Sequence, residues 1–321
     1  MKRLKYKILL SDVLVLLISV IPIYISYLTV LSNYDDNILY SQAYQNIHLL
    51  SLSDAYIHYK IYTGGSELVY FILSYVSSYY LTYTVFIVSL NAIFLSSLYQ
   101  SFKKYFRNYK IIYIVTVLTN FYLYVFLLNT HKIKLALIFL MFFALFSKLK
   151  KTWLLISIIT HFQVLIYPIY LATDSLITKI KSKKILILKR KNIKNIIFLM
   201  FLSGCSLLLW FDDIVNKIQL YYSVGTANRT VLITIMYYAY LSVFKLHNER
   251  ARFLVISLVI IALAIVVSGD RVNFILMEYI FFIEMNRYLH NNSFALIILV
   301  PLIFYNLAKL ILYVNTATYS V

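Results

Sequence analysis

The amino-acid sequence predicts an all-α fold: a polytopic transmembrane helical bundle of about nine to eleven membrane segments, one or two of them re-entrant or broken. Of the 321 residues, 62% are hydrophobic and only 13% are charged, and the mean hydropathy is +0.80. A soluble domain is about half apolar and a quarter charged. The apolar residues form a series of runs near the roughly 20 residues that cross a bilayer core. We therefore expect a single integral membrane domain over residues 1–321.

The formal net charge of +18 does not predict a nucleic-acid partner, because the lysines and arginines stand mainly in short loops between apolar runs. There they orient the helices and meet anionic lipid headgroups. The first run, residues 8–31, follows a basic tail, is too long for a signal peptide and lacks a small-residue cleavage site. We interpret it as a retained first helix with a cytoplasmic N-terminus.

The next stretch, residues 32–66, is the longest polar one and has a single lysine, so we expect it to be an outer loop. Residues 68–102 are apolar for longer than one crossing needs, and a basic cluster that belongs in the cytoplasm follows them. An odd number of crossings is therefore required. One full helix preceded by a short interfacial or re-entrant piece near residues 68–79 fits best.

Residues 111–128 then lead outward to a short turn, and residues 133–147 lead back, which puts His131 and Lys132 at the outer face. The run 152–176 contains His161 and precedes a dense basic loop at about 178–194. A single crossing would leave that loop outside, whereas a re-entrant or broken helix would keep it inside. We favour the second alternative, which also predicts a cavity near His161, because non-helical backbone at membrane depth needs protein or water partners.

The remaining crossings continue this alternation. Residues 195–211 lead to a second outer loop at about 212–229, and residues 230–244 lead back. Residues 253–268 then lead outward to Asp270 and Arg271. The last two runs are residues 272–285 and 294–313. The polar features of the outer side therefore converge on one face of the bundle.

Ionisable side chains at membrane depth or at its edge are expensive, so each is a functional candidate. His161 is either a proton acceptor or donor or a histidine bonded to a neighbouring helix. Arg271 is either a snorkelling anchor, with Asp270 as its ion-pair partner, or a fork for phosphate or carboxylate. His131 and Lys132 either cap the interface or add positive charge for a diphosphate.

Acidic and aromatic residues of the first outer loop are candidates for sugar chemistry. Asp35, Asp36 and Glu67 could bind hydroxyls or act as a general base, and loop tyrosines such as Tyr40 could stack on sugar rings. The sequence has no P-loop, no GxSxG, no HExxH and no DxD-type nucleotide-sugar motif. Its single cysteine excludes an intramolecular disulfide and a cysteine-based metal site. We expect no cofactor and no metal.

Several short elements resemble those of the EpsG/Wzy-type polysaccharide polymerases, which extend O-antigen, capsule or exopolysaccharide chains. They occur in the same order and at similar spacing over most of the chain. In sequence order they are Asp35-Asp36-Asn37-Ile38-Leu39-Tyr40, Gly65-Ser66-Glu67-Leu68-Val69-Tyr70-Phe71, residues 132–136, Thr160-His161-Phe162, and Gly269-Asp270-Arg271 with Tyr279 beyond. Lys132 stands where the family often has an arginine, and Ile133 where it has a glutamine.

The resemblance implies transfer of a growing glycan from undecaprenyl diphosphate to the non-reducing sugar of another lipid-linked repeat unit. The reaction would take place at the periplasmic face of the bacterial inner membrane, with a chain-length regulator protein and membrane lipid as further partners. Arg271, with Lys132 or His131, would neutralise the diphosphate leaving group. Asp35, Glu67 or His161 would deprotonate the acceptor hydroxyl. Asp36, Tyr40, Asp270 and Tyr279 would help to bind sugar or diphosphate.

Three other functions stay open at this point. A flippase for the same lipid-linked unit would share the bundle, the basic rim and the polar cavity, although such proteins usually show two related halves. A membrane acyltransferase is a further alternative, because some use one buried histidine. A non-catalytic assembly subunit is the last. The sequence does not specify the sugars or the linkage, because those depend on pocket shape.

Overall fold

The structure, a computed structural model, describes residues 10–31, 37–105, 109–119, 123–124, 127, 130–146, 149–161, 164, 307 and 311. The chain divides into two units, residues 1–160 with 292–321, and residues 161–291. Every helix described below belongs to the first unit, whereas His161 and Val164 are the described residues of the second. The secondary-structure elements among the described residues are all helices, with no strand, as the predicted all-α class requires. The expectation of a single membrane domain stays a prediction.

The first helix, α1, spans Leu10–Leu31 and coincides with the first predicted apolar run. The predicted outer loop contains short helical segments instead of irregular chain. These are α2 (Asn37–Gln45), the 3₁₀ turn η1 (Ile47–Leu49) and α3 (Leu52–Thr63). α3 begins with a capping interaction, because the Ser51 hydroxyl accepts a hydrogen bond from the Asp54 N–H at 3.3 Å.

The apolar stretch 68–102 forms two helices, α4 (Leu68–Ser78) and α5 (Tyr83–Tyr105). The prediction of one short and one full-length helix is therefore confirmed. α4 buries Tyr70, Phe71 and Ser74, one helical face, and exposes Leu68, Ile72 and Val76 on the other. Its position relative to a bilayer stays a prediction.

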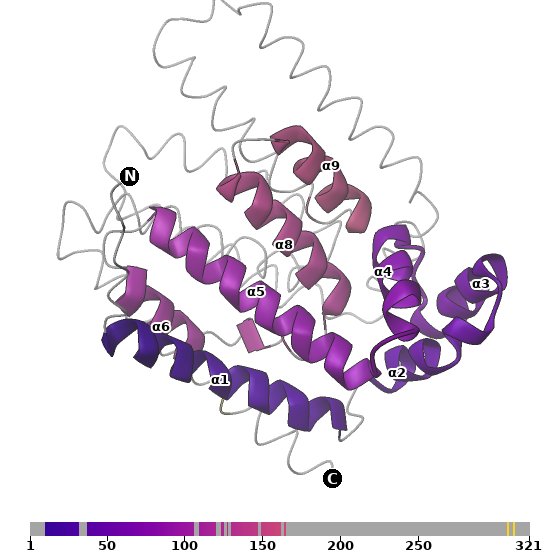
Figure 1. Cartoon of the computed structure of the whole chain (residues 1–321), viewed down its shortest axis with the longest axis horizontal. Helices are drawn as coiled ribbons and strands as arrows, with labels where there is room; N and C mark the ends of the chain where they lie inside the picture. Colours follow the sequence, from indigo (N-terminus) through magenta and orange to yellow (C-terminus); the bar gives the residue numbers. More distant parts are fainter. Residues whose placement is uncertain are drawn as a thin grey trace, which may run out of the picture. The chain divides into compact units, whose positions relative to one another are not determined.

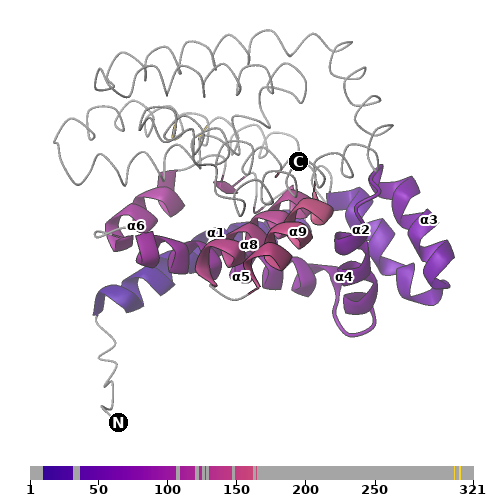
Figure 2. The same ribbon diagram turned by 90° about the horizontal axis from the view of Figure 1, so that it is seen from above.

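α5 is the central helix of the first unit. Its buried residues recur every three or four positions, from Tyr83 through Ile87, Asn91 and Phe94 to Phe102. α5 contacts α1 and α6 (Tyr109–Thr119) on one side and α8 (His131–Leu145) on the other, and α9 (Lys150–Thr160) packs on α8 (Figure 1). The α2–α4 group lies at one end of α5, away from α6 (Figure 2), and Tyr44 of α2 contacts Tyr83, the first residue of α5.

Within the described residues, Tyr83–Lys104 of α5 is the helix long and apolar enough to cross a bilayer, judged by length and composition. Half of the apolar 18-residue stretch of this helix is buried inside the protein. A core helix of a soluble protein can have the same length, composition and burial. The multi-pass arrangement therefore stays a prediction. α9 ends at Thr160, directly before His161, and the broken-helix alternative for the run 152–176 stays a prediction. The predicted cavity and the basic loop 178–194 lie outside the described residues.

Candidate functional site

A buried ion pair joins the start of α4 to the start of α8. The Lys132 ammonium nitrogen Nζ lies 2.7 Å from Glu67 Oε2, and the two side chains are 8% and 6% exposed, respectively. Glu67 directly precedes α4, so its carboxylate stands at the positive end of that helix macrodipole. Lys132 stands in the first turn of α8, where the macrodipole disfavours a cation. Glu67 therefore supplies the counter-charge that this lysine needs.

Two tyrosine rings cover the same ammonium group. Lys132 Nζ lies 5.5 Å from the centroid of the Tyr40 ring and 5.3 Å from that of the Tyr59 ring. A cation at this distance from an aromatic face is attracted by the ring quadrupole. We call Tyr40, Tyr59, Glu67 and Lys132 the Glu67–Lys132 cluster. Its members come from α2, α3, the residue before α4, and α8.

Two adjacent glycines connect α3 to this cluster. Gly64 has a φ of 59°, a left-handed conformation that glycine adopts without strain, and its N–H closes α3 by bonding to Lys60 O at 2.9 Å. Gly65 is needed for a different reason, because a Cβ there would overlap both Lys132 Nζ and the Glu67 carboxylate. The backbone at Gly65 therefore packs directly against the ion pair.

A second buried polar network lies beside the cluster, between α2, α5 and α8. His131 Nε2 lies 2.8 Å from Asn37 Oδ1, and the Tyr83 hydroxyl donates to the same oxygen at 3.1 Å. The other ring nitrogen of His131, Nδ1, lies 3.1 Å from Lys134 Nζ. The His131 ring meets Tyr40 edge-on, with 5.6 Å between the ring centroids and an interplanar angle of 82°. Through this contact the network adjoins the Glu67–Lys132 cluster.

Lys134 and Asn91 complete the network, which we call the His131 network. Lys134 Nζ donates to Asn91 Oδ1 and to the backbone carbonyl of Leu127, the latter at 3.0 Å. The Asn91 amide nitrogen donates to the same carbonyl at 3.1 Å. Neither His131, Asn91 nor Lys134 has any exposed surface. The two oxygens that accept hydrogen bonds from Lys134 Nζ both belong to uncharged groups.

Burial sets the protonation of the groups that stand in the predicted outer loop and turn. It raises the pKa of Tyr44 to about 12. Burial, with the nearby Glu67 charge, raises the pKa of Tyr59 well above its usual value. His131 precedes the predicted crossing, and burial, together with the Lys134 charge, lowers its pKa well below the usual 6.5. At neutral pH the two tyrosines are neutral phenols and His131 is a neutral imidazole.

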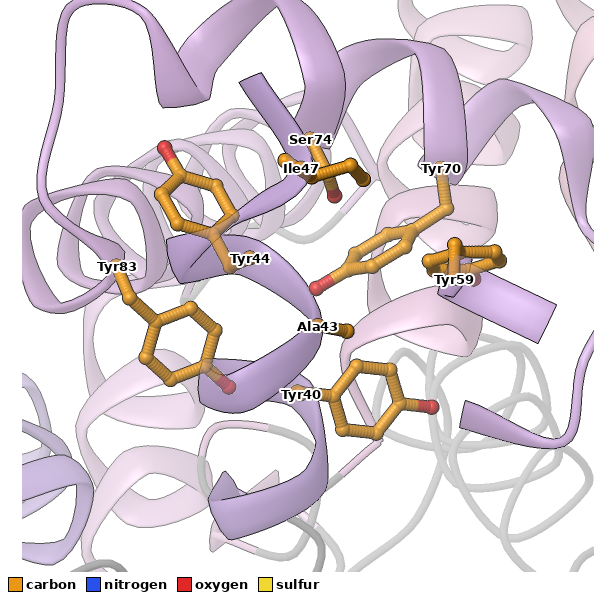
Figure 3. A pocket seen from close by; sticks show the side chains of 8 residues that line it. All are labelled: Tyr40, Ala43, Tyr44, Ile47, Tyr59, Tyr70, Ser74 and Tyr83. Atoms are coloured by element: carbon orange, nitrogen blue, oxygen red, sulfur yellow. The ribbon is translucent and has the colours of Figure 1, made fainter. Parts of the chain in front are cut away.

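A small cavity lies among tyrosines of α2–α5. Figure 3 shows five tyrosines around it, together with Ala43, Ile47 and Ser74. Its volume of about 10 Å³ corresponds to one water molecule, whereas ligand pockets measure about 300–1,000 Å³. Among the described residues, the buried hydroxyls of Tyr59 and Ser74 have no hydrogen-bond partner. The cavity is too small for a sugar, so the tyrosine side chains here form packed core.

The structure brings together four of the residues singled out from the sequence: Tyr40, Glu67, His131 and Lys132. His161 is only 3% exposed, and the Val164 N–H bonds to its carbonyl at 3.2 Å, but it belongs to the second unit. The other five candidates lie outside the described residues. They are Asp35, Asp36, Asp270, Arg271 and Tyr279.

Sequence reasoning missed the partners that hold these side chains. Asn37 sits directly after the acidic pair of the first outer loop, and Asn91 is an amide inside an otherwise apolar run. Lys134 stands three residues after His131, the spacing that puts two side chains on one helix face. That spacing, and the position of an amide inside an apolar run, are signals that could have identified Lys134 and Asn91.

The described site combines one paired cation, one carboxylate, a neutral histidine and tyrosine faces. Such groups suit an anionic ligand, since the Lys132 ammonium can exchange its carboxylate partner for phosphate oxygens. In the described part of the chain, no three His, Cys, Asp or Glu side chains are grouped as a metal site would require. Comparison of the chain with protein-family models, curated proteins and solved structures found no match.

Proposed function

We propose that this chain is a multi-pass membrane glycosyltransferase that polymerises undecaprenyl-diphosphate-linked oligosaccharides into O-antigen or a related surface polysaccharide. The reaction takes place at the outer face of the bacterial inner membrane. One observation carries the proposal: Tyr40, Glu67 and Lys132, which stand in three separate elements of the family resemblance, lie together, with His131, the residue before the third element, beside them. The elements are up to 92 positions apart (132 − 40), so nothing in the local sequence forces them to meet.

The two units to be joined are amphiphiles. The site must bind the lipid diphosphate end and the sugar end of each unit. The acceptor hydroxyl oxygen attacks the anomeric carbon of the donor, and the bond from that carbon to the diphosphate oxygen breaks. The electron pair leaves with the diphosphate, and the hydroxyl proton goes to a base. Protein cations stabilise the negative charge that grows on the leaving group. Because the diphosphate is already a good leaving group, the reaction does not require a metal.

Lys132 supplies that cation in preference to His131. Lys132 is a charged ammonium paired with a carboxylate, so a diphosphate can take the place of Glu67. His131 cannot bind the diphosphate in this way, because Lys134 Nζ already lies against its Nδ1 atom. In the free protein Glu67 neutralises Lys132 and holds it in position. Arg271 keeps its predicted role as the second cation.

The proton acceptor is Asp35, Glu67 or His161. Pairing with Lys132 stabilises the ionised form of Glu67 and so weakens it as a base while the pair is intact. Glu67 becomes a stronger base once phosphate has drawn Lys132 away. This sequence of events couples binding of the donor to activation of the acceptor.

Chain extension with purified protein tests the proposal directly. The full-length protein in liposomes receives two lipid-linked repeat units, and the products are analysed by mass. A polymerase forms a new glycosidic bond and yields a two-unit product, whereas a flippase forms none and an acyltransferase adds acyl mass. Absence of a two-unit product from folded wild-type protein would refute the proposal.

Variants then connect the activity to the site. Lys132→Met should lower chain extension by about 10²- to 10³-fold, the usual cost of losing one stabiliser of developing charge. The matched control is Lys103→Met, which removes an exposed lysine from the last turn of α5. We expect it to leave the rate unchanged. In cells, deletion of the gene should abolish long chains and leave one-repeat material.

A further inference from the structure

The His131 network contains two basic side chains in direct contact. His131 Nδ1 and Lys134 Nζ are 3.1 Å apart, and both side chains are completely buried. Two positive charges at this distance in a low-dielectric interior would repel strongly. The hydrogen bonds around the pair determine how many protons it holds.

The Asn37 side fixes one ring nitrogen of His131. Asn37 Oδ1 accepts a hydrogen bond from the Tyr83 hydroxyl, and it faces His131 Nε2 at 2.8 Å. A carbonyl oxygen can only accept. Nε2 must therefore carry a proton.

The Lys134 side fixes the other nitrogen. Lys134 Nζ donates to two oxygens, Asn91 Oδ1 and Leu127 O, and its third direction points to His131 Nδ1. Only one hydrogen fits between Nδ1 and Nζ. It belongs either to an ammonium that donates to a neutral imidazole, or to an imidazolium that donates to a neutral amine. An amine is intrinsically more basic than an imidazole by about four pKa units, so the proton stays on lysine.

We propose that His131 and Lys134 together carry a single positive charge, with His131 held as the neutral Nε2–H tautomer, and that Lys134 thereby positions the Glu67–Lys132 cluster. The positioning runs through Tyr40, because its ring meets His131 edge-on and its face lies 5.5 Å from Lys132 Nζ. This inference does not depend on the polymerase activity.

The other titratable groups around His131 do not change this assignment. Tyr40 of α2 and Tyr83 of α5 contact the ring edge-on. Lys132 and Glu67 form the ion pair that Tyr40 adjoins, and their charges compensate each other. Lys134 is thus the charged group that acts on His131 directly.

Nitrogen NMR of the full-length protein labelled with ¹⁵N-histidine tests the proposal. The sequence has six histidines, and His131→Gln identifies the His131 signals by removing them. Glutamine is also the conservative replacement, because its uncharged amide can donate to Asn37 and accept from Lys134. We expect one protonated nitrogen, Nε2, and one unprotonated nitrogen, Nδ1, from pH 8 to pH 5.5. A histidine with a pKa of about 6.5 would be about nine-tenths protonated at pH 5.5.

Lys134→Met tests whether the lysine is the cause. Without the ammonium, Nδ1 loses its donor and the repelling charge, so we expect the His131 signals to titrate at higher pH than in the wild type. Lys103→Met should leave them unchanged. Two protonated ring nitrogens at neutral pH in the wild type, or an Nδ1–H tautomer, would overturn the proposal. This wild-type measurement decides the protonation and tautomer of His131 even if the Lys134 variant does not fold.

Discussion

The buried Glu67–Lys132 pair makes a quantitative prediction for single and double replacements. At the observed separation of 2.7 Å, Coulomb attraction is about 6 kcal/mol for an effective dielectric constant of about 20. Much of this is offset by the desolvation of two charges that are less than one-tenth exposed. Removing one partner leaves the other buried and unpaired, which costs about 3–5 kcal/mol. We expect this loss of stability for Glu67→Met and for Lys132→Met.

The double variant Glu67→Met/Lys132→Met should behave differently. It removes both charges and fills the space with side chains of similar length, so its free energy of unfolding should lie within about 1 kcal/mol of wild type. Reversible unfolding in mixed micelles, with increasing anionic detergent, measures all four proteins. The expected coupling energy between the two positions is then several kcal/mol.

Two results would refute this reasoning. Losses below about 1 kcal/mol in both single variants would mean that the pair is solvated and contributes as little as a surface ion pair. Additive losses in the double variant would mean that the two side chains do not interact. The double variant also separates stability from activity, because it should fold and yet fail in chain extension.

Three further predictions concern neighbouring positions. Gly65→Ala should displace the ion pair and lower the free energy of unfolding by about 1–3 kcal/mol, whereas Gly64→Ala strains only the backbone. Chain extension should therefore fall far more in Gly65→Ala than in Gly64→Ala. Asn91→Leu removes a buried amide that both donates and accepts a hydrogen bond, and should lower the free energy of unfolding by at least about 1–3 kcal/mol. The control is Ser101→Ala, which removes a part-buried hydrogen bond and should cost less than about 1 kcal/mol. Arg271→Ala should abolish polymerisation at normal protein levels, measured from the glycan profile, and full polymer would exclude its proposed role.

Local pattern was enough to predict the apolar helices of the described region. α1, α5 and α8 follow runs whose length and hydropathy identify them, and α4 was expected as a short piece because the charge pattern required an odd number of crossings. α2 and α3 were missed because their sequences are polar enough to resemble a loop. Ser51 with Asp54, and Gly64, are start and stop signals that mark α3 without any apolar run.

The site was predicted only in part, for a different physical reason. Glu67, His131 and Lys132 are ionisable residues beside apolar runs, so their chemistry identified them, whereas Tyr40, one of several loop tyrosines, was identified by its place in the family resemblance. Their partners depend on contacts between distant parts of the chain: His131 and Asn37 are 94 positions apart, and Lys134 and Asn91 are 43 apart. No periodicity encodes such pairs. Whether the cation was Lys132 or His131 could therefore be argued only with the hydrogen bonds known.

The first turn of α8 shows how a site can gather cations without accumulating charge. Three basic residues, His131, Lys132 and Lys134, stand at the positive end of that helix, where the macrodipole opposes each of them. One is neutral, one shares its surroundings with uncharged oxygens, and one is cancelled by Glu67. With the proposed proton count, these three residues and Glu67 together carry a net charge of plus one. An arriving diphosphate would then meet a single uncompensated charge held in the interior, and would gain a second only by separating Lys132 from its carboxylate. The ion pair would thus select for ligands anionic enough to compete with Glu67, as a diphosphate is and a neutral sugar is not.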